Sequence, residues 1–163
     1  MTISQTAKNN HEQLFPKSQG TLQITDPELL EIFENFTFDE VLREHNVDIR
    51  TRLMVILAAC LGSQALLEFR MTVNGALNVG VTAVEIKEII YQAVPYVGMA
   101  KVVDFILVSN EIFESRGIKL PLESQATTSQ ETRLEKGLEV QKAIFGEVID
   151  QMYTDSPANQ IHI

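Results

Sequence analysis

The chain has 163 residues, with 13 Lys and Arg against 22 Asp and Glu, which gives a formal net charge of −9. This acidity argues against a nucleic-acid binder, because neutralising phosphates requires clustered Lys and Arg. The length suits one domain with a real hydrophobic core. Cys60 is the only cysteine, which excludes an intrachain disulfide and a zinc site built on several thiolates.

The negative charge is concentrated in the two flanks of the chain. Residues 1–50 contain nine acidic and four basic residues, residues 111–163 contain nine and five, and residues 51–110 contain four of each. We therefore expect any reaction centre in the neutral, apolar middle, where a low dielectric shifts pKa values.

The sequence predicts a cytoplasmic protein with no membrane partner. Residues 1–10 are polar and lack the apolar segment of a signal peptide. The longest apolar run, Leu53 to Leu61, is about half as long as a membrane-spanning helix requires.

The N-terminal elements begin with a polar stretch, residues 1–25, which we predict to be flexible. A first helix is expected from Asp26-Pro27 to about Phe36, because Asp can cap a helix and Pro fits its first turn. The pattern Thr37-Phe38-Asp39-Glu40 is a capping box and predicts a short helix to about Glu44.

The middle of the chain is predicted to be a series of helices. Asp48 is the expected cap of a helix that contains Leu53 to Leu61. Because that helix is apolar all round, it should be buried in the domain centre or across a subunit interface. Further helices are expected over residues 64–79, from the capping box Thr82-Ala83-Val84-Glu85 to about Val94 before the break at Pro95, and over residues 99–116.

The C-terminal third is predicted to be a polar linker and a helical arm. The linker spans residues 118–130, and Thr128-Ser129-Gln130-Glu131 forms a third capping box before helices over residues 131–145 and 147–153. Strand signals are nearly absent, so the predicted fold class is all-α. The expected organisation is a flexible segment 1–25, a helical domain 26–117, a linker 118–130 and an arm 131–163.

The segment from Asn74 to Glu88, NGALNVGVTAVEIKE, resembles the hallmark of the carboxymuconolactone decarboxylase family, within the alkylhydroperoxidase D-like superfamily. Tyr96-Val97-Gly98 matches the end of the family pattern, and Thr51-Arg52 stands where such proteins often carry Thr-Arg. The resemblance covers roughly residues 26–117. It implies a bundle of about six helices that forms a homo-oligomer, a trimer or hexamer, with sites where neighbouring subunits meet.

The resemblance also implies two kinds of chemistry. The decarboxylase members are lyases that act on a carboxylated lactone without a cofactor, so a small carboxylated substrate is the expected ligand. The alkylhydroperoxidase-like members use a Cys-x-x-Cys pair with a nearby Glu and His to reduce peroxides or disulfides.

The positions that carry this chemistry in the family hold other residues here. The family's His falls on Thr72, its Glu on Leu53, and its two cysteines on Ala65 and Glu68. A Thr hydroxyl cannot exchange a proton near neutral pH as an imidazole does. We therefore predict a catalytically incomplete or structural domain, whose status as an enzyme the sequence leaves undecided.

Two enzymatic alternatives stay open. Glu68, Arg70 and Thr72 could form a rearranged lactone decarboxylase-like site, with Arg70 holding a substrate carboxylate. The competing interpretation of Glu68 and Arg70, which we favour, is a solvated stripe or an intersubunit ion pair. Cys60 could be the reactive thiolate of a single-cysteine peroxidase. The favoured interpretation is that Cys60 packs as a small hydrophobic side chain in a buried helix, where the pKa of its thiol is raised.

Metal ions and cofactors are not predicted. His11, His45 and His162 lie in the acidic flanks, share no helical spacing and pair with no Glu at metal-ligand spacing.

The C-terminus suggests a tandem arrangement. Residues 145–161 loosely repeat the pattern around Leu14-Phe15-Pro16 and Asp26-Pro27, and the family includes chains with two copies of the domain. The hypothesis is that residues 131–163 begin a second copy, and the alternative is a terminal arm that packs on its own or a neighbouring subunit.

Overall fold

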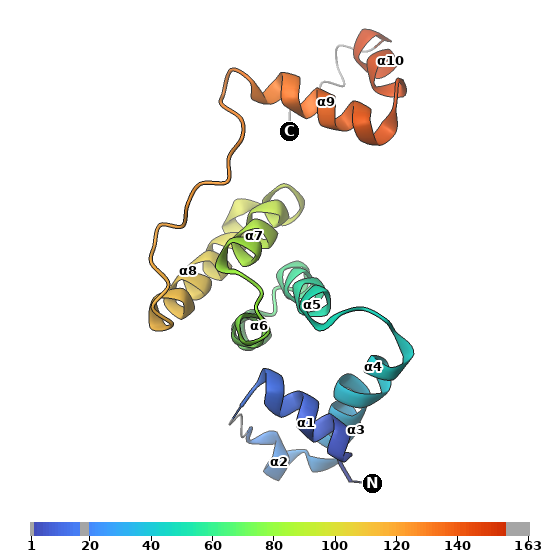
Figure 1. Cartoon of the computed structure of the whole chain (residues 1–163), viewed down its shortest axis with the longest axis vertical. Coiled ribbons are helices and arrows are strands. Elements are labelled where there is room, and N and C mark those ends of the chain that lie inside the picture. The colour runs from blue at the N-terminus through green and yellow to red at the C-terminus, as the bar shows by residue number, and fades with distance from the viewer. Residues whose placement is uncertain (1, 17–19, 156–163) are drawn as a thin grey trace. The chain divides into compact units, whose positions relative to one another are not determined.

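A computed structural model describes residues 2–16 and 20–155, and at residues 154 and 155 it describes the backbone only (Figure 1). All regular elements in these residues are helices, which confirms the all-α prediction. The chain divides into two compact units, residues 1–122 and 123–163. The sequence predicts a linker between the helical domain and the arm at residues 118–130.

The first element is a helix where a flexible segment was expected. Helix α1 (Gln5–Leu14) begins at Ser4, whose side chain accepts a hydrogen bond from the backbone N–H of Ala7. Ala7 and Leu14 are buried in the core, so this polar helix is anchored by two apolar positions. A short helix α2 (Leu22–Thr25) follows.

The next three elements form one continuous helical stretch. Helix α3 (Pro27–Asn35) runs into a π-helical turn η1 (Phe36–Glu40) and then into α4 (Val41–Glu44). The capping box predicted at Thr37 to Glu40 does not form, because these residues continue the helix. In the π turn, the N–H of Val41 donates to the carbonyl of Phe36, five residues earlier.

Helix α5 (Ile49–Ser63) begins as predicted at Asp48, which accepts hydrogen bonds from the backbone N–H and hydroxyl of Thr51. Its inner face is buried in the core. Its outer face is exposed within this chain, where the side chain of Val55 is 62% accessible. The prediction of burial on every side is therefore not met within a single chain.

Helices α6 (Leu66–Asn78), α7 (Ala83–Val97) and α8 (Met99–Ser115) complete the first unit. Helix α5 packs against α6 and α7, and α8 packs against the same two helices. Their shared core includes Leu57, Phe69, Ile90 and Phe113. Helix α7 does not end at Pro95 as expected but continues to Val97, because proline there removes only one N–H from the last turn.

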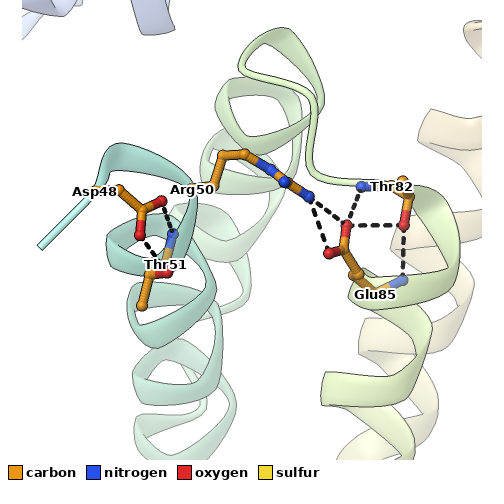
Figure 2. Close-up of polar contacts among 5 residues, drawn as sticks. All are labelled: Asp48, Arg50, Thr51, Thr82 and Glu85. Atoms are coloured by element: carbon orange, nitrogen blue, oxygen red, sulfur yellow. Dashed lines mark hydrogen bonds and ion pairs between the residues drawn. The ribbon is translucent and has the colours of Figure 1, made fainter.

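The start of α7 is a capping box, as predicted. The Thr82 hydroxyl accepts from the backbone N–H of Glu85, and the Glu85 carboxylate accepts from the backbone N–H of Thr82 at 2.7 Å. Figure 2 shows Arg50 reaching from α5 to both oxygens of Glu85, at 2.9 and 3.0 Å. These bonds fasten α5 to the start of α7.

The second unit contains a helical hairpin, α9 (Arg133–Phe145) and α10 (Val148–Asp155). An ion pair between Lys142 and Asp150 links the two helices. The capping box predicted at Thr128 to Glu131 is absent, because α9 begins at Arg133 without a side-chain cap. Part of the proposed second-copy pattern, from Ser156 onward, and His162 lie outside the described residues.

In the part of the chain that the structure describes, no helix is both long and apolar enough to cross a membrane.

Candidate functional site

A cavity of about 600 Å³ lies inside the first unit. Its walls come from α1, from the stretch α3–η1–α4, from α5 and from α6. This volume is within the range typical of sites for small molecules. The lining residues are Asn10, Gln13, Leu14, Phe15, Phe33, Thr37, Phe38, Leu42, Ile49, Arg52, Leu53, Ile56, Glu68 and Thr72.

The lining is mostly apolar and contains three aromatic rings, from Phe15, Phe33 and Phe38. Phe38 is buried, whereas Phe33 is half exposed and marks the edge of the cavity. The rings of Phe15 and Phe38 meet edge to face, with centroids 6.2 Å apart. Such a wall favours a ligand with a flat, apolar body.

Arg52, on α5, brings a positive charge to the cavity lining. Its Nη2 donates to the carbonyl oxygen of Thr37 at 2.6 Å, and the ion pairs of the described residues do not include it. Burial lowers the pKa of Arg52, although a guanidinium remains charged at neutral pH. An anion in the cavity would compensate this partly desolvated charge.

Glu68 and Thr72 lie one turn apart on α6, and both line the cavity. Glu68 is exposed at its edge, and Thr72 is buried. Residues four apart share a helix face, whereas a residue two positions on does not. Arg70 accordingly lies outside the lining and pairs with Glu111 of α8, Nη2 to Oε2 at 2.5 Å.

The three residues predicted as a rearranged site are therefore only partly brought together. Glu68 and Thr72 share the cavity, and the cation that accompanies them is Arg52 instead of Arg70. Both partners of the Arg70–Glu111 pair are about half exposed, as expected for a solvated stripe.

Cys60 lies on α5 and is buried, and it is not among the residues that line the cavity. Burial raises the pKa of the Cys60 thiol, and the negative charge of Glu68 raises it further. The thiolate is therefore scarce at neutral pH, which makes the sulfur a poor nucleophile.

The histidines hold no metal site in the described part of the chain, where no group of three metal-ligating side chains occurs. His45 follows α4 and is exposed. His11 lies on α1 with its Nδ1 2.6 Å from Oε2 of Glu34, a buried carboxylate on α3. Sequence spacing gives no signal for this pair, because its partners are 23 residues apart.

Comparison with known families decides the assignment. Residues 27–111, more than half of the chain, match the profile of the carboxymuconolactone decarboxylase family. The chain belongs to this family. A search of curated proteins found no significant match.

Positions of the family pattern lie at two places in the fold, the cavity and the start of α7. Leu53 and Thr72, which stand where the resemblance places a Glu and a His, both line the cavity. The hallmark residues Thr82 and Glu85 form the capping box of α7 (Figure 2). Hydrogen bonds that Thr82 donates to the Glu85 carboxylate, and then the charge and hydrogen bond of Arg50, lower the pKa of that carboxyl. That part of the motif has a structural role.

Sequence reasoning missed three features of the cavity. Arg52 was noted only as part of a Thr-Arg pair, and α1 was expected to be flexible although it forms a wall. The π turn supplies two carbonyl oxygens to cavity residues, from Thr37 to Arg52 and from Phe38 to Asn10. Helical periodicity does not reveal a π turn, so the sequence could not show that these two carbonyl oxygens accept hydrogen bonds from cavity residues.

Proposed function

We propose that this family member binds a small, largely apolar molecule with an acidic group in the cavity, and that it lacks the family's catalytic activity. The observation that carries the proposal is Arg52. It is a half-buried cation without an ion-pair partner in the described residues. It lines a cavity that has an aromatic wall and a volume suited to a small molecule.

Arg52 is suited to hold an acidic group. A guanidinium offers several N–H donors, and one of its terminal nitrogens already bonds to Thr37. A carboxylate can accept two parallel hydrogen bonds from such a group, and charge-assisted bonds are stronger in a poorly solvated site. The bond to Thr37 also fixes the side chain before a ligand arrives, which reduces the entropic cost of binding.

The cavity chemistry supports binding without turnover. Leu53 has no ionisable group, and the Thr72 hydroxyl does not titrate near neutral pH. Cys60 lies outside the lining and its pKa is raised, so a peroxidase based on this thiol receives no support.

Binding can be tested with 2-naphthoate and its neutral analogue 2-naphthamide, measured by calorimetry. We expect the acid to bind more tightly than the amide. Arg52→Met should weaken binding of the acid by about tenfold to a hundredfold and leave the amide nearly unchanged, because only the acid forms charged hydrogen bonds. Arg50→Met is the matched control, since Arg50 lies on the same helix and bonds to Glu85 away from the cavity lining.

Equal affinity of the wild-type chain for the acid and the amide would contradict the proposal. The same conclusion follows if Arg52→Met and Arg50→Met change the affinity for the acid equally.

A rearranged enzyme is a second candidate, favoured by the placement of Glu68 one turn from Thr72 on the cavity. In this alternative the Glu68 carboxylate exchanges a proton with the substrate. Turnover of carboxymuconolactone that disappears in Glu68→Gln and persists in Glu88→Gln would replace our proposal with this one. Glu88 is a suitable control because it lies outside the cavity lining. We expect no turnover in any of the three chains.

We further propose that the chain assembles as a homo-oligomer, a trimer or hexamer, through the outer face of α5. Val55, Ala58, Ala59 and Gly62 are exposed on that face, and small residues allow close helix packing. Ala59→Glu should then lower the mass measured by light scattering to that of a single chain. A wild-type chain that is monomeric at high concentration would contradict this assembly.

A further inference from the structure

Helix α1 lies outside the residues that match the family, yet it forms one wall of the cavity. The family match begins at residue 27, and α1 ends at Leu14. Asn10, Gln13, Leu14 and the adjoining Phe15 all line the cavity. The shape of this wall is therefore set by a segment that the family match does not include.

The end of α1 is seated on α6 by two contacts. The side-chain amide of Asn78 donates to the carbonyl oxygen of Leu14 at 2.8 Å. The ring of Phe15 lies against Gly75, where an added Cβ would be 2.6 Å from Cε1 and 2.9 Å from Cζ of the ring. Real Cβ atoms do not approach other atoms so closely, so the present position of the ring requires glycine at 75.

Other contacts hold α1 against α3 and η1. The Asn10 side chain donates to the carbonyl oxygen of Phe38 at 2.7 Å. The ring of His11 packs edge to face on Phe15, with centroids 5.6 Å apart, and pairs with the buried Glu34. Phe15 is thus held by α6 on one side and by the ring of His11 on its own helix.

We propose that Phe15 is a specificity-determining residue, which sets how large an apolar body the cavity admits, and that Gly75 is a positioning residue that keeps its ring in place. This inference rests on the proposed function, because it concerns the ligand of the same cavity. It assigns the choice of ligand size to a wall that α1 provides, while Arg52 holds the acidic group at another.

Two substitutions should change the cavity in different ways. Phe15→Ala removes the ring and enlarges the cavity, so a larger ligand gains contacts and a smaller one leaves part of the space empty. Gly75→Ala adds a methyl group outside the cavity lining and forces the ring away from its present position. Because the atoms nearest to the added methyl group belong to the Phe15 ring, we expect the second substitution to act on ligand choice through Phe15.

The experiment compares the dissociation constants of 2-naphthoate and anthracene-2-carboxylate, which differ by one fused ring. Phe15→Ala should shift the ratio of the two constants toward the larger acid by about tenfold, as expected for burying one more ring. Phe15→Leu is a second variant, which retains part of the apolar contact and serves if Phe15→Ala does not fold. It should shift the ratio in the same direction by a smaller factor. Phe36→Ala is the control, because Phe36 is exposed and lies outside the lining.

The role of Gly75 is tested in two backgrounds. Gly75→Ala should change the ratio in the wild-type chain and should have no effect on it in the Phe15→Ala chain. An effect that persists without Phe15 would overturn the positioning role. If Gly75→Ala changes the affinity for both acids by one common factor, the ratio stays the same. That outcome would indicate a structural effect alone and would also overturn the positioning role.

The inference and the proposed function fail in different ways. If the acids bind but the ratio is unchanged in both Phe15 variants, the inference is overturned and the proposed function stands. If the wild-type chain binds neither acid, the proposed function is overturned, and the inference falls with it.

Discussion

The helices of the first unit and the hairpin of the second use similar sequence signals with different results. In α5 to α8 the apolar positions converge on one core, where Leu57 and Phe113 are completely buried. In α9, which packs against α10, no residue is buried within the chain. Helical periodicity thus predicts a helix in both units, but a core and a cavity require faces from several helices.

The largest expected difference between the units is in the cost of removing a leucine side chain. Leu57→Ala in α5 should lower the free energy of unfolding by about 2 to 5 kcal/mol, because it leaves a cavity in the core. Leu134→Ala in α9 should change it by less than about 0.5 kcal/mol, since that side chain is half exposed. Urea unfolding measures both values, and equal losses would show that the hairpin has a core of its own.

Thiol reactivity offers a second comparison within one molecule. Cys60 is buried and its pKa is raised, whereas a cysteine introduced by Val140→Cys in α9 would be exposed. We expect Cys60 to react with a thiol reagent at least about tenfold more slowly than the new cysteine. Rapid labelling of Cys60 in the native chain would contradict its assignment as an inert core residue and would support a reactive thiolate.

Two of the three capping-box sequences, one in each unit, give a smaller difference. Thr82→Ala removes a side-chain cap that the structure contains, and we expect it to cost about 1 kcal/mol of stability. Thr128→Ala changes the same sequence pattern where no cap is formed at α9, so its effect should be close to zero. Thermal unfolding of the two variants checks this, and a reversed order would contradict the assignment of the caps.

The smallest expected effect is a pH dependence centred on Glu85. The folded-state pKa of Glu85 is lowered, chiefly by hydrogen bonds from Thr82. Its stabilising contribution is therefore present above the ordinary pKa of 4.5 and is lost as the pH falls through the lower folded-state value. Glu85→Gln should flatten the decline of stability below about pH 4.5. Glu131→Gln, in the second unit, should leave the acid unfolding of the first unit unchanged.

Particular residues show how far the sequence predicts this molecule. The start of α5 at Asp48 and of α7 at Thr82 follow from local hydrogen bonding, so the sequence is sufficient there. The helix at residues 5–14 was missed, because two buried positions, Ala7 and Leu14, stabilise it through tertiary contacts.

The candidate site was predictable only in part, for the same physical reason. Glu68 and Thr72 share a helix face by their spacing, so local geometry brings both to the cavity. The same spacing separates Arg70 from them, and the structure pairs it with Glu111. The approach of Phe15 to Gly75 joins residues 60 positions apart and has no local signal.

The acid-to-amide preference of the cavity tests the central claim most directly. We predict that the wild-type chain binds 2-naphthoate at least about tenfold more tightly than 2-naphthamide, and that Arg52→Met reduces this ratio to about one. A ratio near one in the wild-type chain, or a ratio that Arg52→Met leaves unchanged, would contradict the assignment of Arg52 as the group that holds the ligand's acid.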